Sequence, residues 1–399
     1  MKILIIGGGF GGLYTAKHLH QLFKSEPLID ITLVNQTNYF LFTPLLHEVA
    51  TGSLSPLSTA EPIREILRGT KIKFVQAVAT NIDKKTQQIE TTAGILDYDY
   101  LVIATGSKTN FYHLDQTKVF QLKNLRDAVN LKNHLIDKIE LATTSKKENK
   151  NKLTTFVIVG GGATGVELAA ELAGFTCQTM IKKYYPSDSN LSQIKIYLIN
   201  SGQAILPHLN SKIQKIATKA LVKKGIDLKL NTKVEEVTTN KVTLSSGEKI
   251  KTETIIWTAG VLPHHPNTED NKRIKVNDFL QDLDDPNIFV LGDVAGQNDP
   301  APMLAQVATK EATIVAKNIK ALINKQKLTP FKFKPQGILI SLGTWNAVGE
   351  VWGLTISGRF TWWLWRTIYL FKFMSWRKRF RIMAEWTVNL FFPRDITKI

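Results

Sequence analysis

Cysteine is almost missing from this chain of 399 residues, in which Cys177 is the single example. One cysteine can form neither a disulfide framework nor a CxxC redox pair within the chain, so we expect an inert thiol. His264 and His265 lie in a proline-flanked loop without a second group of ligand residues in the neighbouring sequence, and a metal site is not expected. The sequence thus argues against disulfide-stabilised scaffolds and dithiol chemistry.

Long apolar runs are also missing. No stretch of about 18 uncharged apolar residues occurs, so we expect no transmembrane helix. The chain passes from Lys2 straight into ILII and then glycines, which leaves no room for a signal peptide before the first strand. The sequence therefore predicts an intracellular protein.

Acidic residues are scarce beside basic ones, with 34 Asp and Glu against 51 Lys and Arg and a net charge of +17. Residues 357–399 hold nine Lys and Arg but only two acids, Glu385 and Asp395. Such an excess indicates a negatively charged partner, either nucleic acid or an anionic membrane. The length predicts two or three domains.

The chain contains an internal duplication. KILIIGGGFGG at 2–12 is echoed by TFVIVGGGATG at 155–165, and each copy is a strand, a GxGxxG turn and a helix. The helices are expected at 13–22 and 166–173, and each is followed by an apolar strand. We also expect strands at 98–107, 253–260 and 287–296, a helix at 303–325 and an exposed linker at 143–152. The predicted fold class is α/β, with two Rossmann-like dinucleotide-binding domains.

The glycines of each turn serve backbone geometry. In such turns the first glycine permits the tight bend, the second lets a pyrophosphate approach, and the third lets the helix pack on the strand. The helix N-terminus then attracts the phosphates. Two turns imply two dinucleotides, which we interpret as a resident flavin nucleotide and a visiting nicotinamide nucleotide. The predicted contacts are Gly7, Gly8, Gly9, Phe10, Gly11 and Gly12 for the flavin nucleotide, and Gly160, Gly162 and Gly165 for NAD.

The position after the second strand of each unit carries an amide. Rossmann folds commonly place an Asp or Glu there to bind a ribose, but this chain has Asn35, followed by Gln36, and Asn200. A neutral hydrogen bond is roughly half as strong as a charge-assisted one. At Asn200 the carboxylate that would repel a 2′-phosphate is missing, yet residues 201–203 offer no cation. NADH stays the expected donor, with weaker discrimination against NADPH.

Several segments resemble a known family. The two glycine turns, ATG at 104–106, TAG at 258–260 and FVLGDVAG at 289–296 resemble the two-dinucleotide flavoprotein reductases. Within that group, FTPLLHEVATGSL at 42–54, GGGATGVELAAEL at 160–172 and APMLAQVATKEA at 301–312 resemble type II NADH dehydrogenase. Its members are single-chain, non-pumping NADH:quinone oxidoreductases at the membrane surface.

The resemblance implies an FAD site. Asp293 would accept a hydrogen bond from a ribityl hydroxyl, Ala308 and Thr309 would lie against the isoalloxazine ring, and Ala79 would offer its backbone to the adenine end. The turns at 104–106 and 258–260 add contacts to FAD and NAD respectively. The residues concerned are Thr105 and Gly106 for FAD, and Ala259 and Gly260 for NAD.

The resemblance also implies three catalytic residues. Glu167 matches a glutamate near the nicotinamide and flavin, and Gln306 matches a glutamine at the quinone end of the flavin. Lys310 stands where the family has a second glutamine, and a cation there could stabilise anionic reduced flavin. Arg366 is a further candidate near the quinone-facing edge of FAD.

Residues 336–399 form a module of different composition, since seven of the eight tryptophans lie between Trp345 and Trp386. Aromatic residues interleaved with cations can bind nucleic acid, or form amphipathic helices at a bilayer surface. The apolar character of residues 362–376 favours the membrane, and nucleic acid is not expected. Burial in a homodimer interface is a third interpretation.

These patterns predict a peripheral protein on the cytoplasmic face of the cell membrane. It would pass hydride from NADH to FAD, and two electrons from FAD to a membrane quinone, without pumping protons. One alternative is an NAD(P)H reductase of a soluble acceptor such as an iron–sulfur protein, and a second is a flavin redox sensor that binds nucleic acid. The expected domains are residues 1–115 and 265–335 for FAD, 116–264 for NAD and 336–399 for the membrane.

Overall fold

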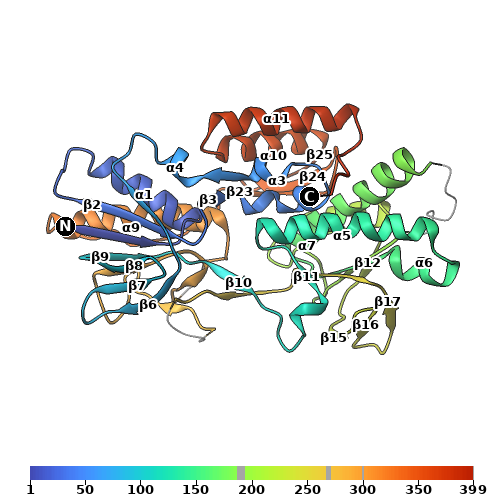
Figure 1. Ribbon diagram of the computed structural model, residues 1–399, viewed down its shortest axis with the longest axis horizontal. Coiled ribbons are helices and arrows are strands. Elements are labelled where there is room, and N and C mark those ends of the chain that lie inside the picture. Colours follow the sequence, from blue (N-terminus) through green and yellow to red (C-terminus); the bar gives the residue numbers. More distant parts are fainter. Residues whose placement is uncertain (187–193, 267–270, 299–300, 399) are drawn as a thin grey trace. The chain divides into compact units, whose positions relative to one another are not determined.

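The computed structural model describes residues 1–186, 194–266, 271–298 and 301–398. The chain forms two compact units (Figure 1). Unit 1 contains Met1–Leu41, Glu61–Lys108 and Val261–Lys334, and unit 2 contains Phe42–Ala60, Thr109–Gly260 and Pro335–Ile399. Segments 42–60 and 335–399 thus belong with the second dinucleotide-binding turn, while the bounds of the four predicted domain segments stay predictions.

The core of unit 1 is a parallel sheet of five strands in the order β21-β9-β1-β2-β5. Their bounds are β21 (Ile288–Val290), β9 (Tyr100–Ile103), β1 (Lys2–Ile6), β2 (Asp30–Asn35) and β5 (Lys73–Gln76). Strand β1 is buried from Ile3 to Ile6, as expected of a strand covered on both faces. Helices α1 (Phe10–Leu22) and α9 (Ala305–Ile323) pack against each other.

Unit 2 repeats this plan, with a parallel sheet in the order β11-β18-β12-β13-β14. The strands are β11 (Phe120–Gln121), β18 (Thr254–Trp257), β12 (Thr155–Val159), β13 (Lys195–Ile199) and β14 (Ile226–Lys229). The helices are α5 (Leu125–Thr144), α7 (Ala163–Ala173) and α8 (Ser211–Lys223). Strand β12 pairs with β13 and β18 as β1 pairs with β2 and β9, which confirms the predicted fold class.

The duplication includes a smaller antiparallel sheet in each unit. In unit 1 it is formed by β6 (Ala79–Asp83), β7 (Gln88–Thr91) and β8 (Gly94–Asp97). In unit 2 it is formed by β15 (Val234–Val237), β16 (Lys241–Leu244) and β17 (Lys249–Lys251). Each lies in the chain immediately before the last strand of its repeat, β9 or β18.

The C-terminal part of unit 2 is an antiparallel sheet followed by two helices. The elements are β23 (Gly337–Ser341), β24 (Ala347–Val351), β25 (Leu354–Gly358), α10 (Arg359–Lys372) and α11 (Trp376–Phe391). Trp362 and Trp365 of α10 and Trp386 of α11 are buried. Within the described ranges, no helix combines the length and apolar character needed to span a lipid bilayer.

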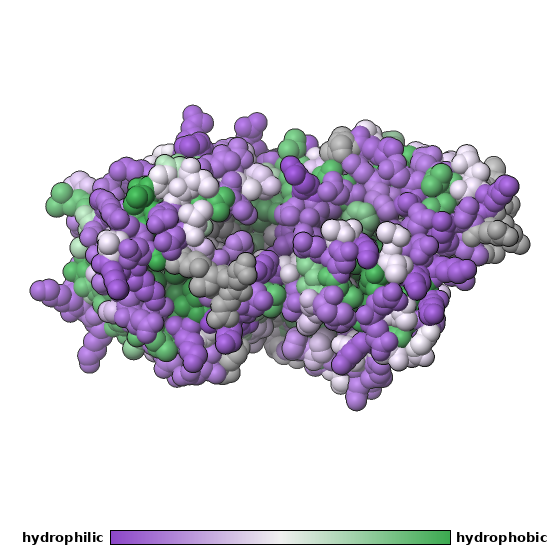
Figure 2. Space-filling view, turned by 60° about the horizontal axis from the view of Figure 1, so that its bottom comes forward, coloured by the Kyte–Doolittle hydropathy of each residue, from purple (hydrophilic) through white to green (hydrophobic). Residues whose placement is uncertain are grey.

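Short elements complete the two units. They are β3 (Tyr39–Leu41), α2 (Leu46–Ala50), α3 (Pro56–Thr59), β4 (Ala60–Pro62), α4 (Ile63–Ile66), β10 (Ser107–Thr109), β19 (Val261–Pro263), β20 (Ile274–Lys275) and β22 (Ala295–Gly296). On the face that Figure 2 shows, hydrophilic side chains cover most of the surface, and hydrophobic ones occur in small groups.

One sequence prediction about a connecting segment was wrong. The expected linker at 143–152 is largely helical, since α5 extends to Thr144 and α6 (Lys147–Leu153) begins three residues later. Leu153 is buried at the end of α6, and Lys152 and Lys138 both pair with Glu253, so the segment is tied to unit 2. Helix α7 ends at Ala173, as predicted, and the chain continues from there as a π-helix over Gly174–Tyr184, which the sequence did not predict.

Candidate functional site

The glycine-rich turn of unit 1 is shaped by close backbone approaches. At Gly7, where φ is +103°, a Cβ atom would lie 2.3 Å from the carbonyl oxygen of Ala104. At Gly12 it would lie 1.8 Å from the carbonyl oxygen of Gly7. At Gly9 no atom lies within 4 Å of the Cβ position, and no side chain caps α1 there. The open space beside an uncapped helix N-terminus fits a dinucleotide pyrophosphate.

The turn of unit 2 has the same construction. A Cβ atom at Gly165 would lie 1.9 Å from the carbonyl oxygen of Gly160, whose φ is +117°. The space at Gly162 is again free within 4 Å, and α7 has neither a side-chain cap nor an acid in its first turn. The two glycine-rich turns therefore offer equivalent positions at which a pyrophosphate group fits.

Asn35, the last residue of β2, and Asn200, the first residue after β13, make the same contact in their two units. Asn35 Oδ1 accepts the N–H of Gly8 at 2.7 Å, and Asn200 Oδ1 accepts the N–H of Gly161 at 3.2 Å. Each amide thereby fixes the glycine-rich turn of its own unit. Gln36 follows Asn35, and its carbonyl accepts a hydrogen bond from Gln76. Phe10 begins α1 and packs edge-on against Phe40.

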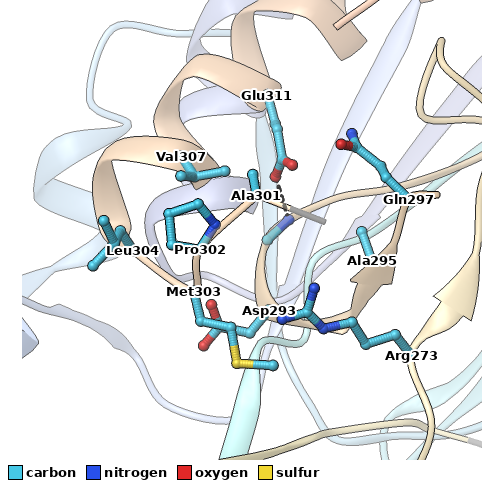
Figure 3. A pocket seen from close by; sticks show the side chains of 11 residues that line it. Arg273, Asp293, Ala295, Gln297, Ala301, Pro302, Met303, Leu304, Val307 and Glu311 are labelled. Atoms are coloured by element: carbon cyan, nitrogen blue, oxygen red, sulfur yellow. Dashed lines mark hydrogen bonds between the residues drawn. The ribbon is translucent and has the colours of Figure 1, made fainter. Parts of the chain in front are cut away.

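Asp293 lies directly after β21, in the short turn Gly292–Val294. Its Oδ2 accepts the hydroxyl of Ser107 at 2.5 Å. Glu311, on α9, accepts the N–H of Gly292 at 2.6 Å, and burial raises the pKa of this carboxyl to about 7. Both acids line the small pocket of Figure 3.

The same pocket holds a buried amide nitrogen, Gln297 Nε2, that has no hydrogen-bond partner among the described residues. A buried donor of this kind is costly unless a ligand or water accepts from it. The pocket is therefore suited to a polar ligand, and its place beside Asp293 fits the predicted FAD. The lining residues are Arg273, Gly292, Asp293, Ala295, Gln297, Ala301, Pro302, Met303, Leu304, Val307 and Glu311.

The other predicted FAD residues of unit 1 lie on the turn after β9, on β6 and on α9. The hydroxyl of Thr105 donates to the carbonyl of His264, and Gly106 has a φ of +71°. Ala79 begins β6. The methyl group of Ala308 lies 3.7 Å from the place that a Cβ atom of Gly292 would take, which brings α9 next to the Asp293 turn.

The first turns of α9 carry the remaining predicted residues of unit 1. The hydroxyl of Thr309 donates to the carbonyl of Gln306 at 3.1 Å. The ammonium of Lys310 donates to the carbonyl of Lys334 at 2.5 Å and lies 5.2 Å from the ring centroid of Phe333. Lys310 is thus held by the segment that follows α9. Its predicted catalytic role, like that of Gln306, stays a prediction.

In unit 2, Ala259 and Gly260 follow β18 and close the second dinucleotide turn. Gly260 has a φ of +82°, and a Cβ atom there would lie 2.8 Å from the hydroxyl of Tyr112. The indole of Trp257 donates to the carbonyl of Ala259 at 3.0 Å. These contacts fix the backbone beside the Gly160 turn.

Glu167 belongs to a group of buried ionisable residues in unit 2 that we call the acid cluster: His47, Glu48, Glu167, Glu171, Arg366 and Arg394. Glu167 Oε1 accepts the N–H of Ser341 at 3.1 Å, and Oε2 lies 3.9 Å from Nδ1 of His47. Burial raises the pKa of Glu167 to about 8, although the Ser341 N–H opposes the shift. Glu167 therefore carries a proton at neutral pH.

Glu48 is a second buried acid with a raised pKa. Its Oε2 accepts the indole N–H of Trp386 at 2.6 Å. Burial raises the pKa of Glu48 to about 7, while the nearby Arg366 guanidinium acts in the opposite direction. Near neutral pH this carboxyl can therefore both hold and release a proton.

Glu171 behaves differently, because it has a close cationic partner. Arg394 Nη2 lies 2.6 Å from Glu171 Oε2, and both side chains are buried. Burial alone would raise the pKa of Glu171, but Arg394 and the other nearby cations hold it below its usual value. The cluster thus contains one ionised carboxylate and two that can carry protons.

Two members of the cluster have polar atoms without hydrogen-bond partners in the described part of the chain: Arg366, at Nε and Nη1, and His47, at Nε2. The Arg366 guanidinium lies 3.8 Å from the ring centroid of Trp362 and 4.8 Å from that of Trp386. Burial lowers the pKa of His47 to about 4, so its imidazole is neutral at pH 7. These atoms leave donors and an acceptor for a polar ligand.

Sequence reasoning had not assigned roles to His47, Glu48, Glu171, Glu311 and Arg394. His47 and Glu48 lie in PLLHEVATG, where two ionisable residues inside an apolar segment were an available signal. Arg394 lies 223 positions beyond Glu171, so no local pattern could have paired them.

The sequence matches the family described as Pyridine nucleotide-disulphide oxidoreductase over residues 1–312, and the NDH2 C-terminal domain over residues 336–395. The chain is 32% identical over 376 residues to a type II NADH:quinone oxidoreductase of Staphylococcus aureus, covering 90% of this chain and 91% of that protein. It is 30% identical over 417 residues to a probable NADH dehydrogenase of Dictyostelium discoideum, covering 99% and 91%. The solved structure of NDH2 from Plasmodium falciparum in complex with NADH has the same fold, with a TM-score of 0.92, 23% identity and coverage of 100% and 99%.

The paired dinucleotide turns and the match over residues 1–312 define a flavoprotein oxidoreductase of the pyridine nucleotide-disulphide class. Within that class, the chain belongs to the type II NADH:quinone oxidoreductases, as the relatives and the C-terminal match show. The predicted enzyme class, the FAD cofactor and NADH as substrate are confirmed.

Proposed function

We propose that the chain passes electrons from NADH to a membrane quinone, without moving protons across the bilayer, while it is bound to the cytoplasmic face of the cell membrane. The observation that carries this proposal is the acid cluster. A quinone needs two protons as well as two electrons, and the cluster contains two buried carboxyls, Glu167 and Glu48, that can hold protons near neutral pH.

Bound FAD would supply the two-electron redox chemistry between NADH and the electron acceptor. The residues of the chain bind and orient the cofactor and the nicotinamide nucleotide. Asp293 and the Gly7 turn would bind FAD, the Gly160 turn would bind the nicotinamide nucleotide, and Glu167 would hold a proton on its carboxyl. The predicted roles of Gln306 at the quinone end of the flavin, of Lys310 toward reduced flavin and of Arg366 beside the quinone-facing edge of FAD remain part of this proposal.

The surface of α10 and α11 supports membrane attachment. Both helices bury tryptophans on one face, while Phe360, Trp376 and Phe391 are each exposed by two thirds or more of their area. Arginines and lysines are interleaved with these rings, and exposed aromatic residues beside cations suit an anionic lipid surface.

The decisive experiment is anaerobic. NADH is added to the FAD-loaded protein while flavin absorbance is followed, and a quinone is then added. We expect NADH to bleach the flavin and the quinone to restore its absorbance. A flavin that NADH reduces but no quinone reoxidises would overturn the proposed acceptor.

Membrane binding is tested by changing exposed rings only. The triple variant Phe360→Ser, Trp376→Ser, Phe391→Ser should sediment poorly with anionic vesicles but keep NADH-dependent bleaching. The matched control replaces three exposed apolar residues of unit 1, Leu28, Ile95 and Leu283, with serine. Equal loss of vesicle binding in both variants would contradict attachment through α10 and α11.

A further inference from the structure

Asn200 follows β13 at the position where a Rossmann fold commonly presents a carboxylate to the ribose. We infer that the hydride-donor site of this chain does not exclude a 2′-phosphate, so that NADPH is accepted as well as NADH. The inference rests on the proposed function in one respect only, namely that the Gly160 turn binds the hydride donor.

The Asn200 amide is fully used within its own turn. Oδ1 accepts the N–H of Gly161, while Nδ2 donates to the carbonyls of Ala204 at 2.9 Å and Gly202 at 3.3 Å. A Cβ atom at Gly161 would lie 2.7 Å from Asn200 Cγ, so the side chain lies directly against the glycine-rich turn. The turn needs both a donor and an acceptor here, which an amide supplies and an ionised carboxylate cannot.

In the described chain, the four residues that directly follow Asn200 carry no negative charge that would repel a phosphate. Residues 201–204 are Ser, Gly, Gln and Ala. Lys229, whose carbonyl accepts the N–H of Asn200, lies at the end of the next strand. Its ammonium is 3.2 Å from Glu248 and 3.8 Å from Asp227, so acids balance its charge. The described surroundings of Asn200 therefore neither repel a 2′-phosphate strongly nor offer an unpaired cation that would attract it.

A carboxylate about 4 Å from a phosphate changes affinity by roughly tenfold or more, depending on how well water screens the pair. Without that repulsion, the two nucleotides should differ little. The net charge of +17 also favours the encounter with the more anionic NADPH.

The first test measures binding, apart from turnover. NAD⁺ and NADP⁺ are titrated separately into the FAD-loaded protein by calorimetry, and NADH and NADPH are then compared in anaerobic bleaching of the flavin. We expect dissociation constants within about tenfold of each other, and bleaching by both donors. Binding of NADP⁺ more than about a hundredfold weaker than that of NAD⁺ would overturn the inference.

The second test moves charge into the site without disturbing Asn200, since Asn200→Asp would lose both donated hydrogen bonds. Ser201 is exposed and adjacent. Ser201→Glu should weaken NADP⁺ about tenfold or more and leave NAD⁺ within about threefold. Ser201→Arg should tighten NADP⁺, and Ser201→Gln is the neutral control of matched size. If Glu and Gln at this position give the same ratio of affinities, the inference is wrong.

These readouts do not involve a quinone. A protein that binds both nucleotides but reduces no quinone would contradict the proposed function and leave this inference standing. A protein that reduces quinone with NADH, yet binds NADP⁺ a hundredfold more weakly than NAD⁺, would support the proposed function and contradict this inference.

Discussion

Replacing Glu167 with glutamine tests whether the acid cluster supplies a proton. Glutamine keeps the shape and can still accept the N–H of Ser341, but it has no proton to release. We expect Glu167→Gln to slow quinone reduction by about a hundredfold, the scale of a lost general acid. Bleaching of the flavin by NADH should change much less, because hydride transfer needs no proton from this group.

The pKa of Glu167 sets the expected pH dependence. With a pKa of about 8, roughly nine in ten molecules carry the proton at pH 7 and one in ten at pH 9. Quinone reduction by the wild type should therefore decline by about tenfold per pH unit above pH 8. The variant should show no such decline.

The same shift predicts a change in stability. The folded-state pKa of Glu167 lies above its unfolded value, so between these values the folded protein binds the extra proton and loses stability as pH rises. Between pH 6 and pH 8 this loss is about 2 kcal/mol in the wild type. Glu167→Gln should therefore gain about 2 kcal/mol relative to the wild type over that interval.

Stopped-flow absorbance of the flavin separates the two half-reactions, and urea unfolding at pH 6 and pH 8 measures stability. Glu235→Gln is the matched control, because Glu235 is exposed. The reasoning is refuted if Glu167→Gln reduces quinone at the wild-type rate with the wild-type pH profile.

Three further changes probe the turns and the rest of the cluster. Gly162→Ala should fold, because the Cβ position is free within 4 Å, and should weaken NADH binding in calorimetry while FAD is retained; unchanged NADH affinity would contradict the proposed pyrophosphate seat. Gly12→Ala should abolish FAD retention after gel filtration, because its Cβ would overlap the carbonyl of Gly7 at 1.8 Å, and a yellow variant would contradict this. Arg394→Leu should cost about 3–5 kcal/mol in urea unfolding at pH 7, since it leaves Glu171 buried and unpaired. That cost should shrink as pH falls and Glu171 is protonated, and Glu171→Gln in the same chain should recover most of it; no loss at pH 7 would contradict the buried pair.

The dinucleotide-binding framework could be predicted because its determinants are local. Each turn can be recognised in the sequence by its glycines between an apolar strand and a helix. The structure explains why these residues are glycines, because the Cβ of an alanine at Gly12 or Gly165 would overlap a backbone carbonyl. The parallel strands are buried apolar runs, which the sequence also displays. The two copies of this pattern therefore predicted two Rossmann-like domains, and the structure adds the order of the strands in each sheet.

The acid cluster could be predicted only in part, because its contacts join distant segments. Glu167 was found through its motif, but Glu48 bonds Trp386 across 338 positions. A carboxyl's pKa depends on burial and on such partners, which periodicity does not reveal. Thus Glu48, Glu167 and Glu171 look alike in the sequence and behave differently in the fold.

The π-helix that continues from α7 could not be predicted from the sequence, for a local reason. Gly174 follows an alanine-rich helix, a pattern typical of a C-terminal cap. In the structure Gly174 has helical angles, φ −62° and ψ −47°, and the chain continues as a π-helix. A Cβ atom at Gly174 would lie 3.2 Å from Arg394 Nη2, so this glycine makes room for the guanidinium that pairs with Glu171.

Because Arg394 belongs to the acid cluster and Ser341 contacts it, the C-terminal segment cannot simply be deleted to test membrane attachment. Deleting residues from 336 onward would remove the exposed rings of α10 and α11, but also Arg394 and the N–H of Ser341 that binds Glu167. The truncated chain would leave Glu171 without its cation and would uncover the apolar surface that now buries Trp362 and Trp365. Loss of quinone reduction would then follow even if the helices never touched a lipid. Substitution of exposed rings alone leaves the acid cluster intact, so only that experiment separates membrane binding from catalysis.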